Sequence, residues 1–154
     1  MLFEIIVSLL REHHIDFVIK EHSPASTSEE SARARNEPLK IGAKALLMKT
    51  KEEFVLVVLP ADRRVDSEKV KAMLKTKNLR FAAPEELREK TGCEKGAVPP
   101  FGSVMGIRMI VDETLFEEEY MAFNAGLLDK SIKMKTADYR HIIKPVIEKF
   151  SVPS

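Results

Sequence analysis

The chain has 154 residues, 44% of them apolar and 32% charged, which suffices for one sizeable hydrophobic core and is short for two domains. Its 25 basic and 24 acidic residues give a net charge of +1, so no overall charge attracts nucleic acid, and any such contact requires a local patch. The only cysteine, Cys93, excludes an internal disulfide and a multi-cysteine metal site. We therefore expect a single domain over residues 1–154 in a reducing, cytoplasmic setting.

The apolar start of the chain has helical spacing. Leu2, Ile5, Ile6, Leu9 and Leu10 follow an i, i+3, i+4, i+7, i+8 pattern, which predicts an amphipathic helix rather than a signal peptide. No apolar run approaches the roughly 20 residues needed to cross a bilayer. We therefore expect no membrane partner.

A strand, a helix and a hairpin are predicted next. Residues 15–21 have the composition of a strand. Thr27 precedes Glu30 by three positions, which is the spacing of a capping box at the start of a short helix. Residues 43–49 and 54–60 are apolar runs joined by the polar sequence TKEE, and they indicate a hairpin whose second strand is buried on both faces.

The second half of the chain alternates helices and short strands. Asp66 or Ser67 caps one predicted helix, and Pro84 begins another that ends at Gly92. A last helix is expected to place apolar side chains from Tyr139 to Phe150 on one face, with a kink or restart at Pro145. Together with strands expected within residues 79–82, 105–113, 120–126 and 131–136, this predicts an α+β fold with a mixed sheet of about seven short strands flanked by four or five helices.

The sequence GAVPPFG, residues 96–102, predicts a stiff loop. Pro99 and Pro100 carry no backbone N–H, and each proline restricts the residue before it to extended geometry. The glycines at both ends let the backbone approach a ligand closely. Such a loop is either a rigid connection, which composition alone favours, or a wall that sorts small side chains by size.

Three other side chains are candidates for chemistry. Lys44 lies in an apolar strand beside alanines, where it either protects an edge strand or places a cation in a pocket. His22 lies at a strand end, where a turn is the simpler explanation. Cys93 follows a helix C-terminus, the end of the helix dipole that disfavours a thiolate nucleophile. The four histidines show no zinc-ligand spacing, so we expect no metal.

Six stretches of the sequence, taken together and in order, resemble the YbaK/ProX family of aminoacyl-tRNA editing domains over nearly the whole chain. The resemblance implies a mixed, barrel-like sheet wrapped by helices, and a free-standing hydrolase that removes a wrong cysteine, alanine or serine from tRNA, often the tRNA for proline. It implies no cofactor and no DNA partner; the expected partners are the 3′ aminoacyl end of mischarged tRNA and an aminoacyl-tRNA synthetase. The stretches are AKALLMK, FVLVVLPADRRVD, LRFAAPEEL, TGCEKGAVPPFG, IVDETL and NAGLLDKSIKMKTADY.

The resemblance also implies site residues. Lys44 matches the functional lysine of the family, which makes it the expected catalytic residue. Gly126 matches a glycine-bearing segment that faces the substrate loop, and His22 and Thr27 fall in the region of the pocket mouth. The substrate loop itself is matched by Gly96, Ala97, Val98, Pro99, Pro100, Phe101 and Gly102.

Two positions depart from the family pattern. Phe17 stands where several members carry a tyrosine, and Ala45 stands where the alanine-specific branch carries an asparagine. The first departure removes a hydroxyl near the substrate, and the second weakens an assignment to alanine.

An aminoacyl ester is already activated, so an enzyme mainly has to orient the attacking group and stabilise the oxyanion that forms on the carbonyl. We expect Lys44 to hold phosphate or ester oxygens, while the N–H groups of Gly96, Ala97, Val98 and Gly126 polarise the carbonyl. The attacker is water, a ribose hydroxyl or the substrate's own thiol, and the sequence does not choose among them. A non-catalytic module that binds a tRNA end or a nucleotide, and a purely structural interaction domain, are the alternatives.

Overall fold

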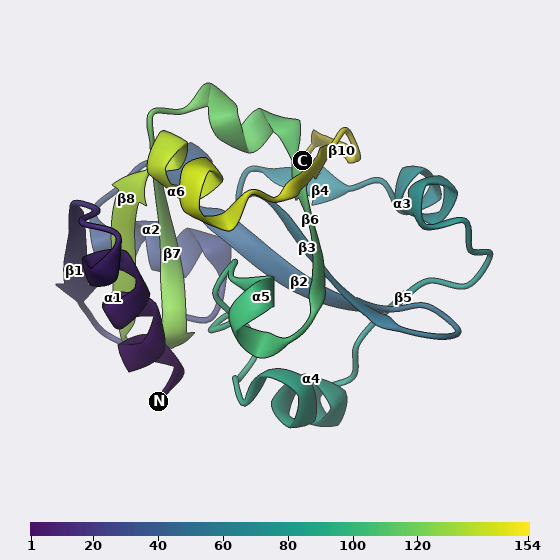
Figure 1. Ribbon diagram of the computed structural model, residues 1–154, viewed down its shortest axis with the longest axis horizontal. Helices are drawn as coiled ribbons and strands as arrows, with labels where there is room; N and C mark the ends of the chain where they lie inside the picture. Colours follow the sequence, from purple (N-terminus) through teal and green to yellow (C-terminus); the bar gives the residue numbers. More distant parts are fainter.

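The computed structural model divides ten strands among three sheets, flanked by six α-helices and two short 3-10 helices (Figure 1). The largest sheet has five strands in the order β5-β2-β3-β6-β9. β2 is antiparallel to β3 and β5, whereas β6 is parallel to β3 and β9, so this sheet is mixed, as expected. Its strands are β2 (Ala43–Lys49), β3 (Phe54–Pro60), β5 (Arg80–Phe81), β6 (Arg108–Asp112) and β9 (Val146–Glu148).

The second sheet is antiparallel, with the order β1-β8-β7, and an isolated bridge between Gly42 and Ala122 connects the start of β2 to β7. The third sheet pairs β4 with β10. All three sheets stay open instead of closing into a barrel, and the remaining strands are β1 (Phe17–Glu21), β4 (Arg63–Val65), β7 (Tyr120–Leu127), β8 (Lys130–Lys135) and β10 (Ser151–Pro153).

The helices begin and end largely where local signals place them. Thr27 caps the second helix with a complete capping box, Asp66 caps the third, and Gly92 ends the fourth in the left-handed conformation. None of the helices is long and apolar enough to span a membrane. They are α1 (Leu2–Glu12), α2 (Ser28–Arg35), α3 (Ser67–Leu74), α4 (Pro84–Thr91), α5 (Gly102–Met105) and α6 (Thr136–Ile143), with 3-10 turns at Leu39–Ile41 and Glu113–Glu117.

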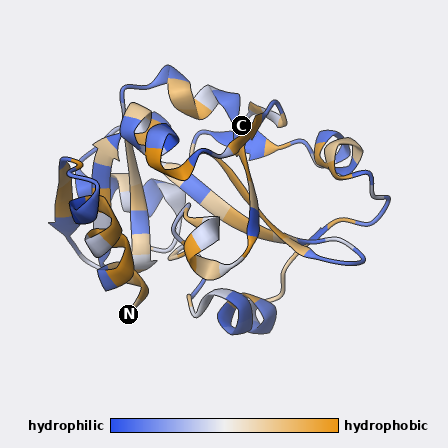
Figure 2. Cartoon of the chain, in the orientation of Figure 1, coloured by the Kyte–Doolittle hydropathy of each residue, from blue (hydrophilic) through white to orange (hydrophobic).

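β3 separates two apolar clusters and is buried on both faces, which confirms the prediction for this strand. Leu56 and Val58 pack into a cluster of 19 buried residues that includes α1 and the three-stranded sheet. Val55 and Val57 pack into a smaller cluster of seven with Val70 of α3. Figure 2 shows the central strands coloured mainly as hydrophobic, whereas α4 is mainly hydrophilic.

The predicted last helix is wrong beyond residue 143. α6 ends at Ile143, Lys144 takes the left-handed conformation, and Pro145 leads into β9. The apolar positions fit helical spacing, but Val146 and Ile147 pair with Ile110 and Val111 of β6 instead. Sheet pairing over a long sequence distance therefore overrides the local pattern. β4, β9 and β10 are the three strands beyond the expected seven.

Candidate functional site

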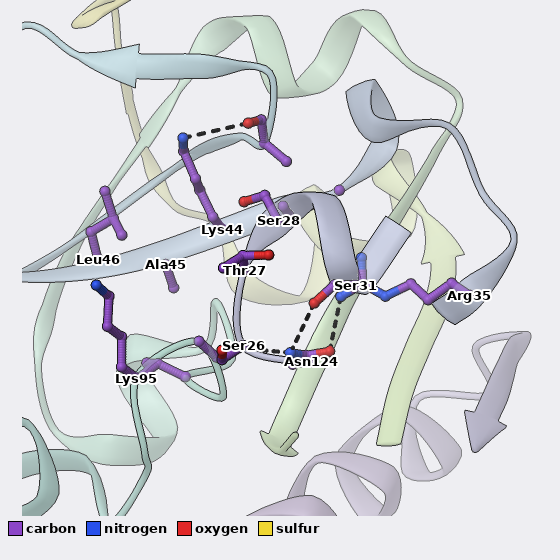
Figure 3. A pocket seen from close by; sticks show the side chains of 15 residues that line it. Ser26, Thr27, Ser28, Ser31, Arg35, Lys44, Ala45, Leu46, Lys95 and Asn124 are labelled. Carbon is purple, nitrogen blue, oxygen red and sulfur yellow. Dashed lines mark hydrogen bonds between the residues drawn. The ribbon is translucent and has the colours of Figure 1, made fainter. Parts of the chain in front are cut away.

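A cavity of about 270 Å³ lies between the start of α2, the start of β2 and the loop around Gly96 (Figure 3). Three basic side chains, Arg35, Lys44 and Lys95, line it, and no acidic side chain does. The cavity therefore favours a ligand with negative charge or with exposed oxygen atoms. Its other lining residues are Ser26, Thr27, Ser28, Ser31, Gly42, Ala43, Ala45, Leu46, Ala61, Gly96, Val98 and Asn124.

Lys44 projects from β2 and is half-buried beside this cavity. Burial lowers the pKa of its ammonium group, and the carboxylates of Glu29 and Asp62 act in the opposite direction. Its Nζ donates one long hydrogen bond, 3.5 Å to the carbonyl oxygen of Ala61, which leaves donors for a ligand. This setting suits a cation placed in a pocket better than an exposed side chain that protects a sheet edge.

The first half of the 96–102 loop reaches the cavity. Gly96 and Val98 line it, and their backbone N–H groups make no hydrogen bond within the protein. Ala97 does not line it, and its N–H donates to the carbonyl of Glu94 at 3.0 Å. Gly126 also lies outside the lining, and its N–H donates to the carbonyl of Ala97 at 2.8 Å. Two of the four expected amide donors are therefore available to a ligand.

Gly96 has to be a glycine for a steric reason. Its φ is +88°, and a Cβ at this position would lie 2.2 Å from the carbonyl oxygen of Ser26. The loop and the segment before α2 therefore touch backbone to backbone.

The second half of the loop is buried behind the cavity and does not line it. Pro99 and Pro100 are buried, and the Tyr139 hydroxyl donates to the carbonyl of Pro100 at 2.5 Å. Phe101 is fully buried, with ring centroids 5.3 Å from Phe123 and 5.6 Å from Tyr139. A Cβ on Gly102 would lie 2.6 Å from the Ile107 carbonyl. These residues hold the loop in place rather than meeting a ligand directly.

The two residues expected at the pocket mouth differ in their positions. Thr27 lines the cavity while its Oγ1 accepts a hydrogen bond from the N–H of Glu30 at 3.1 Å. His22 lies outside the lining, with Nε2 2.7 Å from the hydroxyl of Ser131 and Nδ1 2.8 Å from the carbonyl of Ser23. His22 therefore contacts Ser131 behind the cavity instead of lining the cavity itself.

A buried polar network, which we define as Arg35, Asn124 and Ser131, fixes the floor of the cavity. The Asn124 Nδ2 donates to the carbonyl of Gly96 at 2.8 Å, and its Oδ1 accepts from Arg35 Nη2 and from Ser131 Oγ, both at 3.0 Å. Arg35 Nε donates to Ser131 Oγ at 2.8 Å. Arg35 is only 7% exposed and makes no salt bridge; burial lowers the pKa of its guanidinium to about 10, against an opposing effect of Glu37. It remains charged at neutral pH.

Cys93 and the histidines supply no chemistry to this cavity. Cys93 is buried outside the lining, and burial raises the pKa of its thiol, which opposes a thiolate. No histidine lines the cavity, so none of its serine or threonine hydroxyls has a histidine base beside it. No group of three or more metal-binding side chains occurs in the structure.

The sequence matches the family model described as "Aminoacyl-tRNA editing domain" over residues 22–142. The chain belongs to this family. It is 36% identical over 150 residues to the multifunctional Ser/Thr-tRNA deacylase ProXp-y of Escherichia coli, with 94% of this chain and 90% of that protein covered. It is 34% identical over 118 residues to the proline–tRNA ligase of Thermosipho africanus, covering 70% of this chain and 21% of the ligase. This editing domain is therefore a hydrolase of the YbaK/ProX family.

Solved structures show the same fold. A candidate trans-editing enzyme for prolyl tRNA synthetase superimposes with a TM-score of 0.81, at 22% identity, over 97% of this chain and 96% of that one. The α+β arrangement of this editing domain is thus a known one, with the cavity at the junction of its two larger sheets.

Sequence reasoning missed the floor of the editing cavity. Arg35 and Asn124 are separated by 89 positions, and no local motif relates them. The sequence does contain a weak signal. Between Tyr120 and Gly126, Asn124 is the one polar residue among apolar ones. A polar residue inside a buried strand needs hydrogen-bond partners.

Proposed function

We propose that this editing domain hydrolyses the ester between a small hydroxyl-bearing amino acid, serine or threonine, and the 3′-terminal ribose of a tRNA. The observation that carries the proposal is that one cavity of about 270 Å³ is lined by Lys44 and by Gly96 and Val98, whose backbone N–H groups make no hydrogen bond within the protein. The name of the similar Escherichia coli deacylase supports serine and threonine.

The polar lining supports the same substrate class. The hydroxyls of Ser26, Thr27, Ser28 and Ser31 surround the cavity, together with the amide of Asn124. Such groups can pair with a substrate hydroxyl, whereas they gain nothing from the methyl group of alanine. A volume of about 270 Å³ has room for a small amino acid together with the ester that it forms, so the hydroxyl-bearing lining rather than size carries the preference.

The reaction follows from these groups. A water oxygen attacks the ester carbonyl carbon, the carbonyl electron pair moves to its oxygen, and the N–H groups of Gly96 and Val98 stabilise that oxyanion. The intermediate then collapses, the bond between carbonyl carbon and ribose oxygen breaks, and the ribose oxygen takes up the proton that the attacking water loses, which releases the free amino acid and the 3′-terminal hydroxyl of the tRNA. The Lys44 ammonium group stabilises negative charge on the ester or on the adjacent phosphate. No step uses a protein nucleophile.

The tRNA for proline is the first acceptor to test, because the family also occurs within proline–tRNA ligases. The candidate trans-editing enzyme for prolyl tRNA synthetase that has the same fold supports action in trans, on tRNA released by a synthetase. We place this activity in the cytoplasm, where charged tRNA is used.

The decisive experiment measures deacylation of tRNAs charged with serine, threonine, alanine, cysteine and proline by the wild type and by Lys44→Ala. We expect multiple turnovers on seryl- or threonyl-tRNA, and a loss of about 100- to 1000-fold in kcat for the variant, as when one oxyanion donor is removed elsewhere. Binding of the charged tRNA without turnover by the wild type would instead identify a non-catalytic tRNA-end module. Activity on alanyl- or cysteinyl-tRNA alone would overturn the hydroxyl preference.

The same assay has a pH dependence with a definite sign. Burial lowers the pKa of Lys44, so this lysine loses its proton at a lower pH than a free lysine does. We expect kcat/KM to fall on the alkaline side, starting below the ordinary lysine pKa of 10.5. Lys44→Arg keeps its charge across this range, so whatever activity it retains should lack that alkaline decline. An identical decline in the arginine variant would assign it to another group.

A further inference from the structure

A second hollow, of about 440 Å³, adjoins the editing cavity and shares five lining residues with it: Ala45, Leu46, Lys95, Gly96 and Val98. The rest of this groove is formed by Leu47, Phe81, Ala82, Pro84 and Leu87, from β2, β5, α4 and the link between β5 and α4. Seven of its ten lining residues are hydrophobic and none is acidic. The groove therefore continues the cavity as an apolar surface with one cation, Lys95, at the junction.

Phe81 is the unusual residue of this groove. Its side chain is 57% exposed, and none of the aromatic or cation–π contacts of the protein involves it. The other exposed aromatic residue, Tyr120, is 38% exposed and has the Lys133 ammonium group 5.1 Å from its ring centroid. The free ring of Phe81 therefore exposes apolar area that no part of this chain covers.

The backbone that carries this ring is held firmly. Phe81 pairs with Met48 in the sheet, and the next residue, Ala82, donates its N–H to the carbonyl of Leu47 at 2.9 Å. Arg80 donates to the Phe81 carbonyl at 3.3 Å and to both carboxylate oxygens of Glu86, at 2.7 and 2.9 Å. An exposed ring on an anchored strand is a preorganised platform, because little conformational entropy is lost when a ligand packs on it.

We propose that this groove binds the 3′-terminal base of the tRNA, stacked on Phe81, an inference that rests on the proposed function. With the amino acid in the editing cavity, the ribose that carries the ester lies at its mouth, and the terminal base extends into an adjoining surface. Unpaired bases bind proteins by stacking on aromatic side chains, with nearby cations on the backbone phosphates. Phe81 supplies the ring and Lys95 the cation.

The test uses a property of the sequence: the chain contains no tryptophan. Phe81→Trp introduces a single fluorophore in the groove, and Val146→Trp introduces one at a site of similar exposure, 56%, on the edge strand β9. The probe is an uncharged RNA minihelix with a single-stranded CCA end, compared with the same RNA ending in an abasic ribose. We expect the CCA minihelix to quench Phe81→Trp, the abasic RNA to quench it much less, and Val146→Trp to respond to neither.

Turnover provides the second measurement. Phe81→Ala should raise the KM for charged tRNA by about 5- to 150-fold, the range for loss of one base–aromatic stack. Phe81→Tyr should keep the wild-type KM. With RNA that ends in an abasic ribose, Phe81→Ala should have no further effect, because the two changes remove the same contact.

Three results would overturn the inference. They are equal quenching by both RNAs, an unchanged KM in Phe81→Ala, and quenching of Phe81→Trp by a synthetase but not by RNA, which would make the groove a protein-binding surface. The quenching experiment needs no turnover, so it separates the two proposals. Base-dependent quenching without deacylation by the wild type would contradict the proposed function and still support base binding in this groove.

Discussion

The two halves of the loop over residues 96–102 differ in their relation to the cavity. In the first half, Gly96 and Val98 line the cavity and their N–H groups make no hydrogen bond within the protein, whereas the second half, Pro99 to Gly102, is buried and contacts Tyr139 and Phe123. A stiff proline pair is thus not itself the wall that a substrate meets. It is the anchor that keeps two neighbouring amides in position, which matters because oxyanion donors act only when they are held in place before the reaction.

The largest effect is expected from adding one methyl group to the first half of the loop. In Gly96→Ala the new Cβ would meet the backbone of Ser26 at 2.2 Å with φ at +88°. We expect a loss of about 2 to 4 kcal/mol in the free energy of unfolding, from backbone strain and overpacking combined. Deacylation should disappear as well.

The matched control is Gly92→Ala. Gly92 also has a positive φ, +72°, but nothing lies within 4 Å of an added Cβ. Gly92→Ala should lower the free energy of unfolding by only about 1 kcal/mol, because only the strain of the left-handed backbone conformation is added. Urea denaturation of both variants measures the difference, and equal losses would show that contact with Ser26 does not constrain the loop.

The next largest effect is expected at the floor of the cavity. Asn124→Ala removes the hydrogen bonds to the Gly96 carbonyl and to Arg35, and leaves buried polar groups without partners. We expect a loss of about 2 to 3 kcal/mol in stability, together with lower kcat because Gly96 is no longer held. Ser31→Ala is the comparison, since Ser31 meets Asn124 only at 3.4 Å and should lose less than about 1 kcal/mol. A folded Asn124→Ala with wild-type kcat would contradict a positioning role.

Much of the fold could be predicted because its signals are local. The capping box at Thr27, the proline start and glycine end of α4, and the apolar runs of β2 and β3 each lie within a few residues. The strand after Ile143 could not be predicted, because its apolar positions fit helical spacing and only pairing with β6 makes it a strand.

The candidate site divides in the same way. Lys44, Thr27 and the loop from Gly96 were expected from the sequence, and the structure places Lys44, Thr27, Gly96 and Val98 around one cavity. The network of Arg35, Asn124 and Ser131 could not be predicted, since it joins α2, β7 and β8 across the fold. The same holds for the availability of each N–H group: Gly126 was an expected donor, but its N–H is committed to Ala97.

The smallest effect is expected in the second half of the loop, where the loss of one hydrogen bond leaves the rest of the anchor in place. Tyr139→Phe removes the hydroxyl that donates to Pro100 and leaves that carbonyl buried without its partner. The ring, its contact with Phe101 and the proline geometry all remain. We expect a loss of about 1 to 2 kcal/mol in the free energy of unfolding, with kcat and KM unchanged, because the amides of Gly96 and Val98 keep their supports.

Tyr120→Phe is the control for that variant, since Tyr120 is the other of the two tyrosines, is exposed, and has no hydrogen bond from its hydroxyl within the protein. Its stability should stay within about 0.5 kcal/mol of the wild type. If Tyr139→Phe lowers kcat strongly while its stability holds, the second half of the loop acts on the reaction as directly as the first. The division between a half that meets the ligand and a half that anchors it would then have to be abandoned.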